Sequence, residues 1–322
     1  MKKMLLALLL LTTLSLSLFA QGGAEQATYP TKPITITIPV SAGGGTDLLV
    51  RSMTGVLKDI LGQTVNVVNK PGAGAAIGYA AGASDKPDGY SVTSMLAELI
   101  TTPQVAQVNF SYESFIPVCN INSECATITV RADAPYDTLE EMIAYAKANP
   151  GSISFGNSGV GGIWHFIAAA VASSTGMEVT HVPFEGGGTA VTALAGGHVD
   201  AVPVTPQEVE VQVKAGRAKV LAVLAPERVA SLPNVPTAKE LGYDDLSFSI
   251  FRGFGVPLNT PDHIVQTLSN AFEKALADPA VTKFMEERHF TKDFQTGAEL
   301  GELMAREEKI YAEMAKQLGL KK

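Results

Sequence analysis

Short segments of alternating apolar and polar residues recur along the chain, and most lead into a stretch with helical apolar spacing. The first is residues 34–38, Ile-Thr-Ile-Thr-Ile, which indicates a buried strand. After it, Leu49, Met53 and Leu57 lie at helical spacing and predict an amphipathic helix. Further strands are expected at 65–68, 90–93, 152–155, 178–182, 201–204, 219–224 and 247–255. Strands that alternate with helices predict an α/β fold.

A glycine-rich segment, residues 39–47 (Pro-Val-Ser-Ala-Gly-Gly-Gly-Thr-Asp), separates the first strand from its helix; we call it the first glycine turn. The first N–H groups of a helix have no partner within it, and the helix dipole places partial positive charge there. Glycines leave these groups open to an anion. The alternative is an ordinary turn in which Thr46 or Asp47 caps the helix.

A similar turn lies in the other half of the sequence. Residues 183–189 (Pro-Phe-Glu-Gly-Gly-Gly-Thr), the second glycine turn, follow the strand expected at 178–182. Residues 156–162 form a further glycine-rich turn between a strand and a helix. A cleft that holds one anion from both sides needs two such turns, so the pair favours anion binding over plain capped turns.

After the last expected strand the chain is helical, at 261–277, 279–288 and 298–318. This helical tail suggests that the end of the chain returns to the first half. We therefore expect a discontinuous first lobe, 28–130 plus 244–322, and a second lobe, 131–243. Hinge strands near 116–130 and 221–251 would join the two lobes.

The chain has 322 residues, enough for a sizeable core, and a net charge of −8, which argues against nucleic acid as a partner. Lys2 and Lys3 precede an apolar run at 4–11, and Ala20 offers a cleavage site. Residues 1–27 are therefore expected to be a signal peptide and flexible N-terminus. Because no cysteine lies near the cleavage site, we expect a periplasmic protein without a lipid anchor.

Cys119 and Cys125 are expected to lie on or between two strands within 115–130, with residues 120–124 as a hairpin loop. In an oxidising compartment they either pair as a disulfide or remain two buried thiols, and the sequence favours neither. No histidine lies beside them, which argues against a metal site.

Local spacing rules out three well-known motifs. Residues 39–47 lack the Gly-Lys-Ser/Thr of a P-loop, and the glycines of 69–78 miss the dinucleotide fingerprint by one residue. Ser158 is not a nucleophile elbow, because Val160 stands where that motif needs glycine. An esterase would need Ser158 to act with His165 or His181 as its base.

Several side chains have two interpretations each. Trp164 lines a ligand cleft or packs in the core, and we favour the cleft. His165 binds a carboxylate or caps its own helix, whereas His181 is expected to be structural. Asp47 is expected to cap its helix more than to touch a ligand. Arg252 holds a hinge strand through an ion pair or reaches the ligand.

Seven motifs occur in order along residues 29–320: KPITITIPVSAGGGTD at 32–47, NKPGAGAAIG at 69–78, KPDGY at 86–90, GNSGVGGIWH at 156–165, HVPFEGGGTAVTALAGGHVDA at 181–201, LPNVPTAKELG at 232–242 and ALADPAV at 275–281. Together they resemble the periplasmic substrate-binding proteins of tripartite tricarboxylate transporters, the TctC/Bug family. The resemblance implies a two-lobed α/β periplasmic-binding-protein fold of type II-like, Venus-flytrap form. It also implies a receptor, not an enzyme, that captures a small organic carboxylate and delivers it to a membrane permease.

The resemblance further implies that the two glycine turns hold the carboxylate largely through backbone N–H groups. The ligand-binding residues expected on this basis are Ser41, Ala42, Gly43, Gly44, Gly45, Thr46, Asp47, Gly72, Ala73, Gly74, Thr93, Ser94, Asn157, Ser158, Gly159, Trp164, His165, Phe184, Glu185, Gly186, Gly187 and Thr205. Glu185 stands where many members have lysine, and residues 203–206 replace a Phe-Asp pair, so a particular acid does not transfer. We expect a monomer without cofactor or metal. The alternative functions are a sensor subunit for a membrane kinase and, less favoured, an extracellular esterase.

Overall fold

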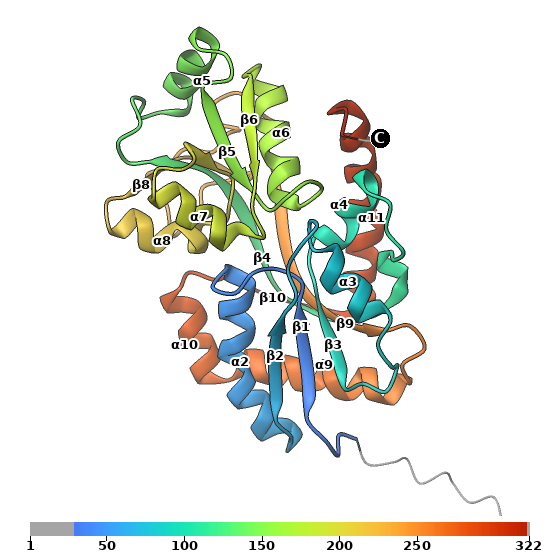
Figure 1. Cartoon of the computed structure of the whole chain (residues 1–322). Coiled ribbons are helices and arrows are strands. Elements are labelled where there is room, and N and C mark those ends of the chain that lie inside the picture. The colour runs from blue at the N-terminus through green and yellow to red at the C-terminus, as the bar shows by residue number, and fades with distance from the viewer. Residues whose placement is uncertain (1–28, 321–322) are drawn as a thin grey trace, which may run out of the picture.

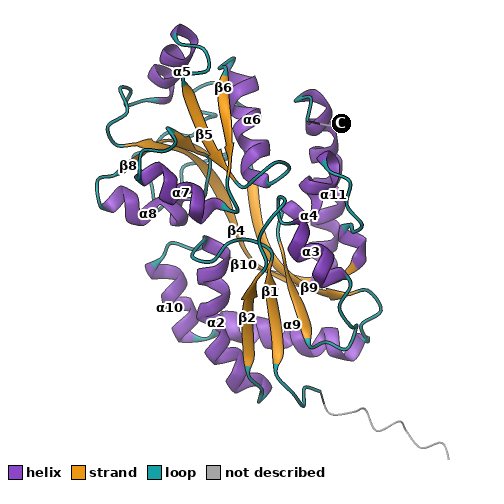
Figure 2. Cartoon of the chain, in the orientation of Figure 1, coloured by secondary structure: helices purple, strands orange, loops and turns teal. Residues whose placement is uncertain are grey.

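The computed structural model describes residues 29–320, in which ten strands form one mixed sheet surrounded by helices (Figures 1 and 2). The strands are β1 (Ile34–Ile38), β2 (Val65–Asn69), β3 (Ser91–Met95), β4 (Phe115–Arg131), β5 (Ile153–Asn157), β6 (Val179–Pro183), β7 (Ala201–Val202), β8 (Ala218–Leu224), β9 (Ser249–Pro257) and β10 (Lys292–Thr296). The helices are α2 (Gly45–Leu61), α3 (Ala76–Ala83), α4 (Glu98–Val105), η1 (Tyr112–Ser114), α5 (Leu139–Ala148), α6 (Ile163–Thr175), α7 (Gly187–Ala195), α8 (Pro206–Lys214), α9 (Asp262–Ala277), α10 (Pro279–Glu287) and α11 (Gly297–Gln317). The α/β class expected from sequence is confirmed. The signal-peptide prediction lies outside the described residues.

The strand order is β2-β1-β3-β9-β4-β7-β5-β6, with β8 and β10 also paired to β4. Strand β4 is 17 residues long and serves both halves: its first part pairs with β9 and β10, and its last part with β8 and β7. Figure 1 shows the resulting two lobes, with α2, α9 and α10 around one and α5 to α8 around the other. The two-lobed architecture is therefore confirmed, whereas the exact boundaries at 130 and 243 stay a prediction.

Both glycine turns follow strands of a parallel arrangement. Strand β1 runs parallel to β2 and β3 in the first lobe, and β6 runs parallel to β5 in the second. Ligands of open α/β sheets collect at the carboxyl ends of such strands. Strand direction therefore places each glycine turn at the carboxyl end of the parallel strands of its lobe, where a ligand is expected.

Apolar contacts hold each lobe together and also join the two. In the first lobe Leu49, Met53 and Leu57 of α2 are buried, as their spacing predicted, and each contributes about 1.5–3 kcal/mol by burial. Between the lobes, Phe166 of α6 meets Tyr311 of α11 edge to face, with ring centroids 5.7 Å apart. Among residues 29–320, no helix is both long and apolar enough to cross a membrane.

The expectation of two strands joined by a loop at 120–124 is wrong. These residues continue β4, because their pairing with β9 and β10 keeps the backbone extended. Cys119 and Cys125 are free and buried, and six residues of extended strand separate their Cα atoms by about 20 Å. A disulfide needs about 4.4–6.8 Å, so the interpretation as two buried thiols holds.

We predict that the protein, isolated without reductant, contains two free thiols that react only after unfolding. Burial raises the pKa of the Cys125 thiol to about 12 and that of Cys119 further, so little thiolate is present at pH 7. A chromogenic thiol count before and after denaturation measures this. A denatured chain without titratable thiol would contradict it.

Candidate ligand-binding site

Three helices begin at glycine N-caps around one small volume. The caps of α2, α6 and α7 are Gly44, Gly162 and Gly186, and none of these helices has a side-chain hydrogen bond at its cap. Side chains do cap helices elsewhere: Thr138 for α5, Asp278 for α10 and Thr296 for α11. The first N–H groups of α6 donate to Glu98 and Ser158, whereas those of α2 and α7 are not taken by a side chain of the described residues. These N–H groups of α2 and α7, with the three helix dipoles, make this volume attractive to negative charge.

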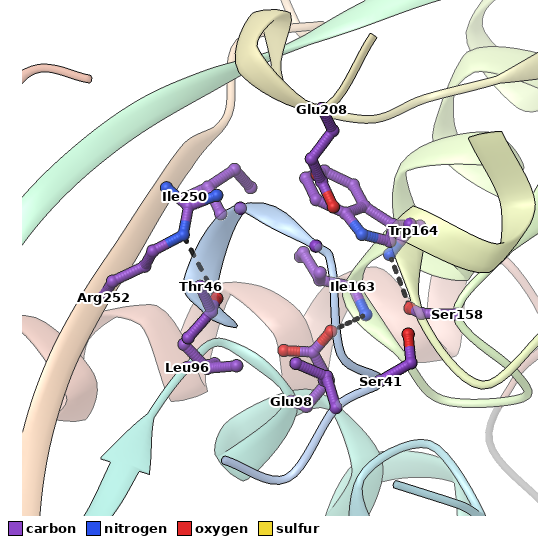
Figure 3. A pocket seen from close by; sticks show the side chains of 15 residues that line it. Ser41, Thr46, Leu96, Glu98, Ser158, Ile163, Trp164, Glu208, Ile250 and Arg252 are labelled. Atoms are coloured by element: carbon purple, nitrogen blue, oxygen red, sulfur yellow. Dashed lines mark hydrogen bonds between the residues drawn. The ribbon is translucent and has the colours of Figure 1, made fainter. Parts of the chain in front are cut away.

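These helix starts open on a cavity of about 30 Å³, shown in Figure 3. It is lined by Val40, Ser41, Gly44, Gly45, Thr46, Leu96, Glu98, Ser158, Ile163, Trp164, Gly187, Gly188, Glu208, Ile250 and Arg252. Since a buried water needs about 10–15 Å³ by a comparable measure, the cavity has room for about two waters. In this arrangement the lobes are closed on each other.

The two glycine turns touch backbone to backbone. A Cβ atom added to Gly188 would lie 3.1 Å from the nitrogen of Gly44, and one added to Gly186 would lie 3.3 Å from the nitrogen of Ser41. Side chains at these positions would hold the lobes apart. Because these glycines have no side chains, they allow the two lobes to approach closely and also leave backbone N–H groups exposed.

Asp47 binds within its own lobe. Its Oδ2 accepts a hydrogen bond from the Gly43 nitrogen at 3.0 Å, and its Oδ1 accepts one from Arg51 Nε at 2.9 Å. Burial alone would raise the pKa of Asp47, but the hydrogen bonds from Arg51 and Gly43 outweigh it and the pKa is lowered. Asp47 therefore braces the first glycine turn. The expectation that it caps its helix is wrong, because the N-cap of α2 is Gly44 and no side chain bonds there.

Glu98 reaches from one lobe to the other. It is the first residue of α4, is 4 % exposed, and its Oε1 accepts a hydrogen bond from the Ile163 nitrogen at the start of α6, at 3.4 Å. Burial is the main cause that raises the pKa of Glu98 to about 7, and the nearby Glu208 raises it further. Hydrogen bonds from backbone N–H groups and the charge of Arg252 lower it in part. The side chain is thus a proton-binding group inside the cavity.

Glu208 enters the cavity from the second lobe. Its Oε2 accepts hydrogen bonds from the Thr205 hydroxyl at 3.1 Å and the Thr205 nitrogen at 3.4 Å, which close the capping box of α8. Its Oε1 points at the glycine turns: a Cβ added to Gly44 would lie 3.4 Å from it, and one added to Gly187 would collide with it.

Arg252 of β9 supplies the positive side chain of the cavity. It is 4 % exposed; its Nε donates to Thr46 Oγ1 at 3.2 Å and its Nη1 donates to Asn122 Oδ1. A Cβ added to Gly45 would lie 2.9 Å from its Nη2. Because both hydrogen-bond partners are neutral, the guanidinium charge stays available to an anion.

Two buried polar atoms near the cavity have no hydrogen-bond partner within the described residues. They are Ser41 Oγ, in the first glycine turn, and Asn157 Nδ2, at the end of β5. Ser158 Oγ accepts from the Trp164 nitrogen at 3.4 Å. Buried polar groups are normally satisfied, so Ser41 and Asn157 suit a bound polar guest.

The two histidines next to this region pack against each other. His165 and His181 meet edge to face with ring centroids 4.9 Å apart, and Gly161 donates its N–H to His165 Nδ1 at 3.5 Å. Burial, followed by the nearby His181, lowers the pKa of His165 to about 4, so its ring is neutral at pH 7. No hydrogen bond in residues 29–320 joins either histidine to Ser158, and the geometry of an esterase is missing.

The residues predicted from sequence fall into three groups. Seven line the cavity: Ser41, Gly44, Gly45, Thr46, Ser158, Trp164 and Gly187. Six line an adjoining open groove of about 950 Å³: Gly72, Ala73, Gly74, Gly159, Phe184 and Glu185. Nine line neither: Ala42, Gly43, Asp47, Thr93, Ser94, Asn157, His165, Gly186 and Thr205. Their ligand-binding roles stay predictions.

Sequence reasoning missed both glutamates of the cavity. Glu98 follows the end of β3 by three residues, a place where ligand-binding groups collect in open sheets. Glu208 lies three residues after Thr205 as part of a Thr-x-x-Glu capping box, which explains its position without reference to a ligand. The position of Glu98 after a strand would have suggested it as a site residue. Glu208 could be recognised only once the fold had shown that it enters the cavity.

Two lobes that close over a buried, donor-rich cavity define a solute-binding receptor of the periplasmic-binding-protein class. A family model described as tripartite tricarboxylate transporter family receptor (TctC) matches residues 49–320. The chain belongs to this family, which is a family of binding proteins. The family resemblance seen in the sequence is therefore confirmed.

Three relatives illustrate the match. A UPF0065 protein in the gbd 5' region of Cupriavidus necator is 34% identical over 316 residues, covering 96% of this chain and 95% of that protein. The solved periplasmic binding protein BugD is 31% identical with a TM-score of 0.87, covering 91% of this chain and 99% of BugD. An R. palustris protein solved with adipate, Rpa4515, has the same fold, with a TM-score of 0.85 at 24% identity, covering 91% and 99%.

We predict that Glu98→Gln changes how stability depends on pH. The pKa of Glu98 is raised from 4.5 to about 7 on folding, so the folded protein holds a proton that the unfolded chain has lost between these values. The free energy of unfolding of the wild type should therefore fall, relative to the variant, as pH rises from 4.5 to 7, by up to about 3 kcal/mol.

Urea unfolding of both proteins across this pH range measures the difference. The control is Glu302→Gln, which changes an exposed glutamate of α11 and should run parallel to the wild type. If the Glu98→Gln curve also stays parallel to the wild type, the raised pKa is wrong.

We also predict that Asp47→Ala destabilises the fold by about 1–3 kcal/mol, because the Gly43 N–H and Arg51 both lose their acceptor. Asp59→Ala, at an exposed position of the same helix, is the control and should have a much smaller effect. Chemical denaturation measures both. A fully stable Asp47→Ala protein that no longer binds ligand would instead assign Asp47 to the ligand.

Proposed function

We propose that this protein is an extracytoplasmic receptor that captures a small organic carboxylate between its lobes and delivers it to the permease of a tripartite transporter. The observation that carries the proposal is the convergence of three helix starts with glycine N-caps on one cavity, two of which, those of α2 and α7, have first N–H groups that no side chain of the described residues takes. Helix N-termini stabilise anions by their free N–H groups and their dipoles.

The side chains around the helix starts support a carboxylate in particular. Arg252 brings a buried guanidinium beside Thr46, and this group suits two-point contact with a carboxylate. Ser41 adds a hydroxyl without a partner. The family description names tricarboxylate transport, and a protein of the same fold was solved with adipate, which is consistent with an organic acid here.

Binding requires the lobes to open and close. The cavity of about 30 Å³ lies where Gly44 and Gly188 approach each other, so a guest larger than a few atoms needs the two glycine turns to part. Strand β4 runs through both lobes, and residues 225–248 return the chain from β8 to β9. We propose that these two connections are the hinge, between a first lobe of 28–130 plus 244–322 and a second of 131–243. A ligand that contacts both lobes would then stabilise the closed form.

We predict that a screen of mono-, di- and tricarboxylates finds an acid that raises the melting temperature by roughly 3–6 °C at about 100 times its Kd. Gly188→Ala should weaken binding of that acid by about tenfold or more, because its Cβ would push against Gly44 and keep the lobes from closing fully.

The matched control is Gly55→Ala, since a Cβ at Gly55 meets nothing within 4 Å. It should bind as the wild type does, as measured by calorimetry. The proposal fails if no acid in the screen shifts the melting temperature, or if Gly188→Ala binds with wild-type affinity.

A further inference from the structure

The guanidinium of Arg252 is held on some of its donors and free on the others. Its Nε donates to Thr46 Oγ1, a bond drawn in Figure 3, and its Nη1 donates to Asn122 Oδ1, whereas Nη2 has no hydrogen bond within the described residues. Nη2 lies toward Gly45, which lines the cavity. No carboxylate lies within 4.0 Å of the guanidinium among residues 29–320, so the ion pair considered for Arg252 is not formed.

The hydrogen bonds continue beyond Asn122, a buried residue of β4. Its Nδ2 donates to Glu124 Oε1 at 2.7 Å and to the carbonyl oxygen of Thr291 at 2.6 Å. The N–H of Thr291 donates to the same Oε1 of Glu124, also at 2.6 Å. Glu124 is 8 % exposed and is therefore fixed by donors from two distant parts of the chain.

These acceptors decide which end of the Asn122 amide faces Arg252. An asparagine amide has a donor end and an acceptor end and can point either of them at a neighbour. The Glu124 carboxylate and the Thr291 carbonyl both take the NH2 end, which leaves the oxygen for Arg252. In the reverse orientation the NH2 group would meet Nη1, donor against donor, and the guanidinium would lose its support.

We propose that Glu124 is a positioning residue of the binding site. It fixes the amide of Asn122, and the amide holds Arg252 so that Nη2 is presented to the carboxylate of a bound acid; we call these three residues the arginine relay. The inference rests on the proposed function, because it assumes that Arg252 contacts the carboxylate. Glu124 lines a different groove, of about 570 Å³, and acts on the guest only through Asn122.

The neutral amide between the two charges has a physical purpose. In a direct ion pair the carboxylate of Glu124 would occupy the donors of Arg252, and the carboxylate of the guest would have to compete with it. With Asn122 between them, Arg252 keeps a free donor group. A negative charge still lies one hydrogen-bonded amide away, which offsets part of the cost of burying the guanidinium.

The segment that follows α10 supports the same arrangement. Thr291 bonds to the relay through both its N–H and its carbonyl group, and the ring of Phe290 lies 5.9 Å from the guanidinium carbon of Arg252. An aromatic ring attracts a cation at this distance. The guanidinium is thus held by α2, by β4 and by the segment after α10, and a guest needs to satisfy only its remaining donors.

A double-mutant cycle tests the relay. The probe is the acid with the largest shift of melting temperature in a screen that includes acetate, lactate, succinate, glutarate and citrate, and its Kd is measured by calorimetry. Arg252→Gln should weaken binding by about thirtyfold or more. Glu124→Ala should weaken it by about tenfold, because the guanidinium is no longer held in place. In a protein that already carries Arg252→Gln, Glu124→Ala should change the Kd by less than about twofold.

Two further variants separate positioning from a loss of structure. Glu124→Gln keeps an acceptor oxygen for Asn122 and Thr291, so it should bind within about threefold of the wild type. Asn122→Ala removes the acceptor of Nη1 and should behave in the cycle as Glu124→Ala does; it takes the place of that variant if Glu124→Ala does not fold. The matched control is Glu273→Ala, at an exposed position of α9, which should bind as its parent does in both backgrounds.

The outcomes distinguish the inference from the proposed function. Equal losses of affinity with and without Arg252 would overturn the inference, because Glu124 would then act on the fold and not through Arg252. Wild-type affinity in Glu124→Ala or in Arg252→Gln would overturn it as well. In each of these cases the acid still binds the wild type, and the proposed function stands. If no acid of the screen binds the wild type, the receptor proposal is refuted, and the inference falls with it.

Discussion

The site depends on one property of every α-helix: its first N–H groups have no partner within the helix. Most proteins satisfy them with a side chain or with water, and α5, α10 and α11 of this protein use Thr138, Asp278 and Thr296. Helices α2 and α7 have glycine caps instead and meet α6, which also has a glycine cap but donates its first N–H groups to Glu98 and Ser158, at one cavity. Local donors and dipoles can thus attract an anion although the chain as a whole carries a charge of −8.

The fold makes this convergence possible through strand direction. Parallel strands β1 and β6 lie in different lobes, and each delivers its glycine turn to the carboxyl end of its sheet. Strand β4 runs through both lobes, so the two halves of the sheet share a continuous backbone. The same glycines then act twice, because their missing side chains expose N–H groups and also let Gly44 approach Gly188.

The sequence predicted what depends on local pattern. Strand alternation, the helical stripe of α2 and the two glycine turns all follow from short-range periodicity and turn chemistry. It failed at β4, because Asn120, Asn122 and Ser123 are residue types common in turns, whereas the pairing with β9 and β10 that keeps them extended is long-range. It also missed Glu98, whose place three residues after β3 was an available signal, and Glu208, whose capping box with Thr205 accounts for it without a ligand. Only the tertiary packing brings Glu208 to the cavity.

Asp47 and Glu98 show how the position of the partners separates structural acids from those of the site. Both lie in the first turn of a helix and both are 4 % exposed. Asp47 has two donors within its own lobe, Gly43 and Arg51, and its pKa is lowered. Glu98 accepts a long hydrogen bond from the other lobe, and burial raises its pKa. An acid satisfied within its own lobe stabilises the fold at all times, whereas one whose partner lies across the cleft is completed only when the lobes close. Burial alone therefore does not identify a site residue in this fold. A hydrogen-bond partner in the other lobe does.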